Sequence, residues 1–365
     1  MSLQALKYSF RYTNNKPDPN FRFLRDCLSR HAYVLYKNQY EDCLNYWISC
    51  MNDMTFSIAT TEKDEIMDLG FPDNIRWNTY VKYNPVDTTH DSPINTLLKL
   101  LDDGHTPTAT TIYHLLKFSV YYNPSIDVAT YQPAHNIIIL HYDEENYYFF
   151  DSLSIDFEPY KENKEIGVIK RKEADPVFEK QLKLDLITFD DMQEDYLRKN
   201  IQCLLDMYIT RFADKSKQFV KSYLVQHGEA AFEKLINICE NKKPSFQTPA
   251  KLFTGEPLSK ILAWKATMII GRKSIVSWWL EQCVGDAGKD TNNVLKKTID
   301  IWEIIKSKVV RDSQNISRRL NAKYAELFRD AYFYEKELHA KMKNFLTYNR
   351  VCYVPRHPYW SDVPR

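Results

Sequence analysis

Three residues of the types used in cysteine-dependent acyl transfer follow one another along the chain: Cys43, His135 and Asp151. This chemistry needs a thiolate nucleophile, a base that removes the thiol proton, and a group that orients the base and stabilises its charged form. A free cysteine taken alone is most often a buried structural residue. The three residues therefore predict a catalytic triad only if the elements that carry them bring them together.

Cys43 is expected in the first turn of a helix. The segment 42–51 (DCLNYWISCM) has apolar residues at helical spacing and follows a polar turn. The N–H groups and the dipole at a helix N-terminus lower the pKa of a thiol. Cys50 lies two turns later, where this effect has faded, and Cys27 lacks a comparable strand–turn–helix setting. We therefore predict Cys43 as the nucleophile.

The oxyanion that forms when Cys43 attacks an acyl group also needs hydrogen-bond donors. The backbone N–H of Cys43 is one candidate. The side-chain amide of Gln39, four residues upstream in the polar turn, is a second, and that of its neighbour Asn38 is the alternative. We predict Gln39 as the side-chain donor.

A predicted β-hairpin should bring His135 and Asp151 together. Two strand-like runs, 136–140 (NIIIL) and 147–150 (YYFF), flank a polar stretch with turn chemistry. His135 precedes the first run and Asp151 follows the second, so they should face one another or lie one diagonal step apart, with Cβ atoms about 4.5–8 Å apart. His141 is a competing base, but it adjoins the turn, and we interpret it as structural.

The elements around these residues divide the chain near residue 185. We predict an α+β fold with a catalytic core over 1–185 and a helical domain or lid over 186–365. In the first half, strands are expected at 31–36, 55–60, 75–83 and 106–111, and a helix at 94–102 that ends near Gly104. In the second half, a first helix ends near Phe212, and others are expected at 216–226, 229–240, 258–283, 291–311 and 314–346.

Composition excludes several classes of function. Lys and Arg (49) balance Asp and Glu (48), so the whole molecule has no charge attraction to nucleic acid or to an anionic membrane. There is no glycine-rich phosphate-binding motif, and the seven cysteines include no CxxC pair, which makes structural zinc unexpected. No export signal and no long apolar stretch is present, so we expect a cytoplasmic protein with reduced thiols and no membrane span.

The order of Cys, His on a strand and Asp after the next strand resembles papain-like cysteine enzymes. A finer resemblance is to the butirosin biosynthesis protein H family. It rests on Asp42–Asn45 (DCLN), on 97–122 (LLKLLDDGHTPTATTIYHLLKFSVYY) and on 134–152 (AHNIIILHYDEENYYFFDS), followed by a helix-rich C-terminal half. The resemblance implies a papain-like core with Cys43 as nucleophile, His135 as base and Asp151 as the residue that orients the base.

The resemblance also implies a reaction and a partner. The type member of that family transfers an aminoacyl chain from a carrier-protein thioester to an amine of an antibiotic precursor, and relatives belong to nonribosomal-peptide and polyketide biosynthesis. No cofactor is expected beyond the phosphopantetheine arm that presents the substrate, and the partners are an acyl or peptidyl carrier protein and a small-molecule acceptor. Because carrier proteins are acidic, the basic clusters 170–172 (KRK) and 318–319 (RR) are candidate docking patches.

Other readings share the same residues. A cysteine peptidase or amidase, or an intramolecular cyclase, would use the same triad with a different acceptor. The alternative without catalysis is an interaction protein whose helical half binds a partner and whose Cys43 is structural.

Overall fold

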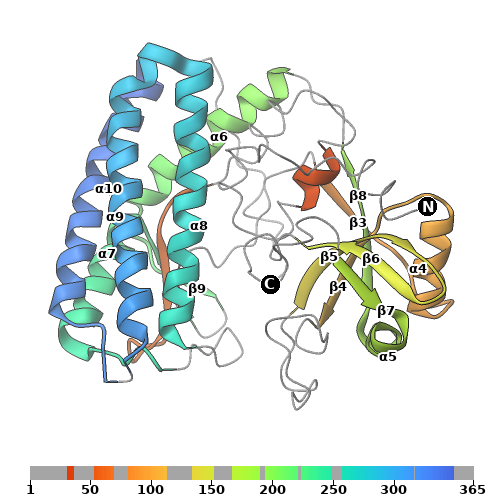
Figure 1. Ribbon diagram of the computed structural model, residues 1–365. Helices are drawn as coiled ribbons and strands as arrows, with labels where there is room; N and C mark the ends of the chain where they lie inside the picture. The colour runs from red at the N-terminus through yellow and green to blue at the C-terminus, as the bar shows by residue number, and fades with distance from the viewer. Residues whose placement is uncertain are drawn as a thin grey trace. The chain divides into compact units, whose positions relative to one another are not determined.

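The structure is a computed structural model. It describes residues 31–36, 53–69, 81–112, 134–151, 167–189, 194–220, 223–248, 257–315 and 317–348. The chain forms two compact units, which we call the sheet unit (1–50 and 78–191) and the helical unit (51–77 and 192–365) (Figure 1). Sequence placed a single boundary near residue 185. The contacts place one at 191/192 and also assign the segment 51–77 to the helical unit.

The sheet unit contains a six-stranded sheet of order β3-β8-β4-β5-β6-β7, in which every neighbouring pair is antiparallel. The last strand of this sheet along the chain lies between two strands from much earlier in the sequence, so side-chain packing has to select this part of the order. The strands are β3 (Val81–Pro85), β4 (Thr108–Ile112), β5 (Ala134–Tyr142), β6 (Asn146–Phe150), β7 (Gly167–Lys170) and β8 (Lys183–Phe189).

Helices α4 (Pro93–Asp102) and α5 (Arg171–Gln181) cover one face of this sheet (Figure 1). The hydroxyl of Ser92 caps α4 by accepting a hydrogen bond from the Asn95 N–H at 3.1 Å. The chain leaves α4 through Gly104, whose φ of +82° is a left-handed conformation that favours glycine. The predicted helix 94–102 and its end near Gly104 are confirmed. The core beneath comprises Leu97, Ala109, Ile137, Ile139, Tyr147, Phe149, Ile169, Ala174, Phe178, Leu182 and Leu184.

Residues 31–36 form a helix, so the strand predicted there is wrong. All six residues are buried, so the segment lacks the alternation between buried and exposed positions that is typical of a half-buried strand. His31 packs edge-on against Phe150, with ring centroids 5.7 Å apart, and Tyr36 packs against Phe189 at 5.2 Å. Tertiary packing therefore overrides the strand preference of Val34 and the tyrosines.

The helical unit begins with a four-stranded antiparallel sheet of order β2-β1-β10-β9. Its strands are β1 (Ser57–Thr60), β2 (Ile66–Leu69), β9 (Gln218–Val220) and β10 (Tyr223–His227). The helix predicted over 216–226 is therefore wrong. Its apolar residues read equally well as a strand, and the strand that selects this state, β1, lies about half the chain away.

Long helices make up the rest of the helical unit, and α8, α9 and α10 run side by side (Figure 1). The helices predicted over 229–240, 258–283 and 291–311 are present, and the last helix begins at Ala322 rather than at 314. The α-helices are α6 (Glu194–Ala213), α7 (Gly228–Asn237), α8 (Leu258–Trp279), α9 (Lys289–Ser313) and α10 (Ala322–Tyr348), with π turns at Ile238–Lys242 and Leu280–Val284. The described part of the chain is thus α+β, with antiparallel sheets and a largely helical C-terminal half.

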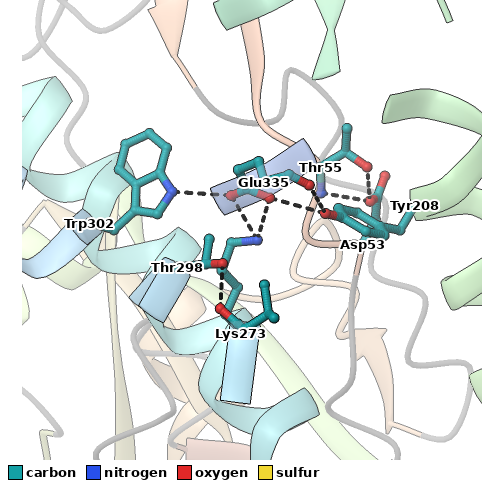
Figure 2. Close-up of polar contacts among 8 residues, drawn as sticks. Asp53, Thr55, Tyr208, Lys273, Thr298, Trp302 and Glu335 are labelled. Carbon is teal, nitrogen blue, oxygen red and sulfur yellow. Dashed lines mark hydrogen bonds and ion pairs between the residues drawn. The ribbon is translucent and has the colours of Figure 1, made fainter. Parts of the chain in front are cut away.

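A buried carboxylate joins four of these helices. Glu335 of α10 forms an ion pair with Lys273 of α8 at 2.9 Å, and it accepts hydrogen bonds from the Trp302 indole at 3.2 Å and from the Tyr208 hydroxyl at 3.1 Å (Figure 2). Lys273 and Glu335 are 0% and 1% exposed. Burial, reinforced by the Glu335 charge, raises the pKa of Tyr208 well above its ordinary value, which keeps this phenol a donor. The charges are buried but fully partnered, as a stable interior requires.

No helix in the described ranges is both long enough and apolar enough to cross a lipid bilayer.

Candidate active site

The hairpin of β5 and β6 positions the candidate catalytic pair. Its turn is organised by Asp143, whose carboxylate accepts hydrogen bonds from the N–H groups of Glu145 at 2.9 Å and Asn146 at 2.7 Å. The Asp143 N–H in turn donates to the Asn146 carbonyl at 3.0 Å. An aspartate that bonds its own backbone two and three residues on is a local signal for a tight turn. This local chemistry explains why the hairpin could be predicted from the sequence.

The register of the hairpin decides how His135 and Asp151 meet. Ile138 pairs with Phe150, and the register shifts by one residue between Ile139 and His141, which marks a β-bulge. Continuing the pairing beyond Phe150 sets Asp151 opposite residue 137. His135 is then one diagonal step from Asp151 on the same face of the hairpin, which is one of the two arrangements expected from sequence.

His135 and Asp151 form a direct hydrogen bond. The distance from Nε2 of His135 to Oδ1 of Asp151 is 3.0 Å, and the two side chains are 9% and 0% exposed. A carboxylate bonded to an imidazole in such a buried setting orients the ring and stabilises its charged form. The predicted partnership between the two residues is therefore present as a contact, which is the geometry that a base and its orienting residue need.

Thr111 is a polar neighbour of this pair that sequence reasoning missed. It pairs directly with His135 across β4 and β5, is 2% exposed, and its hydroxyl has no hydrogen-bond partner among the residues that the structure describes. Its side chain thus shares the sheet face with His135. Only the strand register reveals this, because nothing in the local sequence of a Thr-rich strand distinguishes Thr111 from its neighbours.

His141 lies at the opposite end of the hairpin from Asp151. Its ring stacks on that of Tyr148, with centroids 5.9 Å apart and planes at 24°. The Tyr148 hydroxyl in turn donates to the turn residue Asp143 at 2.6 Å. Burial lowers the pKa of His141, which favours its neutral form. These contacts agree with the structural interpretation of His141.

The other residues predicted for the site, Cys43 and Gln39, lie outside the described residues. Among the described cysteines, burial raises the pKa of Cys203 and Cys283, and it raises that of Cys239 to about 12. Such thiols are poor nucleophiles near neutral pH. The described cysteines therefore offer no competitor to Cys43.

The two basic clusters considered for docking differ in their contacts. Lys170 pairs with Glu145 at 2.8 Å, and Arg171 lies 3.8 Å from Asp175 and over the ring of Tyr142. The charges of this cluster are thus largely engaged within the sheet unit. Arg318 and Arg319, in contrast, are exposed and line a cavity of the helical unit.

Within the described ranges, no group of three or more His, Cys, Asp or Glu side chains is arranged to hold a metal ion. Comparison with known proteins adds no relative: the sequence matches no protein-family model, and no curated protein resembles it significantly.

Proposed function

We propose that this protein is a cysteine-dependent acyltransferase in which Cys43, His135 and Asp151 form the catalytic triad. The observation that carries the proposal is the buried hydrogen bond between His135 and Asp151. A histidine fixed by a buried carboxylate is the arrangement that activates a thiol or hydroxyl nucleophile in several unrelated enzyme classes.

The proposed reaction proceeds in two steps. His135 removes the proton of the Cys43 thiol, and the thiolate attacks the carbonyl carbon of a thioester. The carbon–sulfur bond of the substrate breaks, the pantetheine thiol leaves with the proton from His135, and an acyl-Cys43 enzyme remains. An acceptor amine then loses its proton to His135 and takes the acyl group, which frees Cys43.

The donor class comes from the resemblance to the butirosin biosynthesis protein H family. A thiol nucleophile suits a thioester donor, because exchange of one thioester for another is nearly thermoneutral. The proposed donor is an acyl, aminoacyl or peptidyl group on a carrier protein, and the papain-like arrangement of the core belongs to the same proposal. The α+β fold and the antiparallel sheet that carries His135 are compatible with it.

Intact-mass spectrometry with acyl-pantetheine thioesters tests the proposal. The wild-type protein should gain the mass of one acyl group, whereas Cys43→Ala should gain none. Cys50→Ala and Cys283→Ala are matched controls, since each removes one thiol and should leave the adduct in place. If Cys43→Ala still forms the adduct, Cys43 is not the nucleophile.

A peptidase or amidase, or an intramolecular cyclase, is the second candidate, because the same histidine and aspartate serve all of these reactions. The isolated acyl-enzyme distinguishes them. Transfer predicts that an added amine accelerates loss of the acyl group and appears in the product. Hydrolysis predicts that the free acid is released at a rate that does not depend on the amine concentration. Cyclisation predicts a product whose mass equals that of the thioester substrate minus the pantetheine thiol, with neither water nor amine added.

The rate of alkylation by iodoacetamide as a function of pH tests the non-catalytic alternative. A catalytic Cys43 should react with a thiol pKa clearly below the ordinary value of about 8.5. A pKa near that value would favour a structural cysteine and an interaction protein.

A further inference from the structure

A polar cavity of about 410 Å³ opens on the helical unit, away from any residue of the proposed triad in sequence. This size lies within the range of about 300–1,000 Å³ that small-molecule sites occupy. Its lining is unusual for such a site, because it contains cationic, amide and hydroxyl side chains in place of apolar ones. The lining residues are Lys243, Asn315, Ser317, Arg318, Arg319 and Asn321.

Two loops form the walls and are held together by backbone hydrogen bonds. Ser245 and Arg319 form an antiparallel bridge, and the Leu320 N–H donates to the Pro244 carbonyl at 3.0 Å. Beneath them, the buried ring of Phe246 packs edge-on against Tyr324 of α10, with centroids 5.3 Å apart. The positions of the lining residues are therefore set by paired backbone and a packed core.

The backbone at each polar lining residue is also fixed locally. Lys243 ends the π turn in a left-handed conformation, with φ of +49° and its N–H donating to the Ile238 carbonyl at 3.0 Å. The Asn315 carboxamide oxygen accepts hydrogen bonds from the N–H and the hydroxyl of Ser317 at 3.0 and 2.7 Å. Asn321 caps α10 by accepting from the Lys323 N–H at 3.0 Å.

The three cations of the cavity form no ion pair with a carboxylate of the described residues. Within the part of the chain that the structure describes, no carboxylate lies within ion-pair distance of Lys243, Arg318 or Arg319. Asp312, a few residues from Arg318, is bound by Lys308 at 3.3 Å and by the Tyr324 hydroxyl at 2.8 Å, and Arg318 acts on it through a longer-range charge interaction alone. Like charges that line one hollow repel one another, and a bound anion would relieve that repulsion.

We propose that this cavity binds a small ligand that carries phosphoryl groups. Arg318 and Arg319, which both line the cavity, carry forked N–H donors that match phosphate oxygens, and Lys243 adds a compact positive charge. The carboxamide N–H groups of Asn315 and Asn321 supply further donors for a polar ligand. The proposal is independent of the acyl-transfer reaction, because none of its residues belongs to the triad.

Isothermal titration of the full-length protein with inorganic pyrophosphate tests this site. We expect one pyrophosphate per chain and weaker binding when the NaCl concentration rises from 50 to 500 mM, because salt screens exposed charges. The double substitution Arg318→Ala/Arg319→Ala should weaken binding at least about 10-fold, since hydrogen bonds between charged groups are the strong ones. Arg318→Lys/Arg319→Lys should show a smaller loss of affinity, because it keeps the positive charges and removes only the paired N–H donors of the guanidinium groups.

The matched control is Lys215→Ala/Lys217→Ala, which removes the same charge from exposed positions of the helical unit outside the cavity. It should change the affinity by less than about two-fold, because exposed charges outside the site are screened, and all variants should melt within a degree or two of the wild type. Absence of pyrophosphate binding at millimolar concentration, or binding that the arginine substitutions leave unchanged, overturns the proposal. Tighter binding of a single-stranded oligonucleotide or of poly-glutamate through the same arginines overturns it too.

Discussion

The hydrogen bond between Nε2 of His135 and Asp151 determines which ring nitrogen can act as a base. A carboxylate accepts a hydrogen bond, so the neutral imidazole carries its proton on Nε2 and presents a lone pair on Nδ1. In the proposed mechanism, Nδ1 is the atom that receives the thiol proton. Losing the carboxylate would therefore alter the tautomer as well as the orientation of the ring.

Replacement of Asp151 by Asn should slow acylation about 10²–10⁴-fold, because the amide can donate to the ring and so favour the wrong tautomer. The rate of acyl-enzyme formation, followed by intact mass after rapid mixing with an acyl-pantetheine, measures the effect.

Asp143→Asn is the matched control on the same hairpin. Asp143 shapes the turn, and hydrogen bonds, above all from the Tyr148 hydroxyl, lower the pKa of its carboxyl to about 2. Its loss should reduce stability slightly and leave acylation within a few-fold of the wild type. Equal losses in the two variants would contradict a specific role for Asp151.

The buried pair of Asp68 and Lys265 gives stability a pH dependence of its own. Their charged atoms are 3.3 Å apart, and burial raises the pKa of Asp68 from 3.8 to about 6. Because the folded-state pKa lies above the unfolded value, the contribution of Asp68 to stability is complete below pH 3.8 and is lost as the pH rises through about 6. The difference corresponds to at most about 3 kcal/mol.

We therefore expect the free energy of unfolding of the wild type to fall between pH 4 and 7 relative to that of Asp68→Asn/Lys265→Met, which has neither charge. Urea denaturation followed by circular dichroism at several pH values measures the two curves. Parallel curves across this window would show that Asp68 titrates normally in the folded protein.

Among the elements, α10 depends most directly on a single buried charge. Glu335 forms an ion pair with Lys273 and accepts hydrogen bonds from Trp302 and Tyr208, which lie on three other helices (Figure 2). Lys273→Met should destabilise the protein by about 3–5 kcal/mol, because it leaves Glu335 as a buried carboxylate without a cation. Urea denaturation provides the measurement.

The double substitution Lys273→Met/Glu335→Leu should cost less than the two single substitutions added together, since it removes both charges. Lys296→Ala breaks an exposed ion pair with Glu281 and should cost no more than about 1 kcal/mol. A loss of similar size at the exposed and the buried pair would contradict this account of α10.

The elements that could be predicted from the sequence are those whose ends are fixed by interactions between residues close together in the chain. The hairpin was predictable because Asp143 and its neighbours specify the turn within a few residues, and the helix after Ser92 was predictable because its cap and its terminal glycine are local too. The segments 31–36 and 218–227 were not, because remote packing partners select their conformation. Cys43 and Gln39 remain predictions, whereas the contact between His135 and Asp151 follows from a hairpin that the sequence encodes locally.

For the whole molecule, the main departure from a simple two-part chain is the segment 51–77. It supplies β1 and β2 to the sheet of the helical unit, and the Ser57 hydroxyl lies 2.6 Å from Nδ1 of His227 on β10. It also supplies Asp53, which pairs with Arg211 of α6 at 2.7 Å, both side chains being buried. The helical unit therefore depends on residues from the first half of the sequence.

A fragment of residues 192–365 should consequently fail to fold cooperatively, because it lacks β1, β2 and the partner of a buried arginine. A fragment in which 51–77 is joined to 192–365 by a flexible Gly/Ser linker should recover a sharp thermal transition. Circular dichroism melts of the two fragments provide the comparison. A cooperative melt of the shorter fragment would show that 51–77 is dispensable.

The same segment sets an order of events during synthesis. Ser57 leaves the ribosome 170 residues before His227, which at about 5–20 residues per second is an interval of about 10–30 s. The whole sheet unit has emerged before that interval ends, since its last residue is Asp191. The nascent chain can thus complete the unit that holds His135 and Asp151 while β1, which can already pair with β2, still awaits β10. During those seconds the open edge of β1 is a site for chaperone binding or for aggregation.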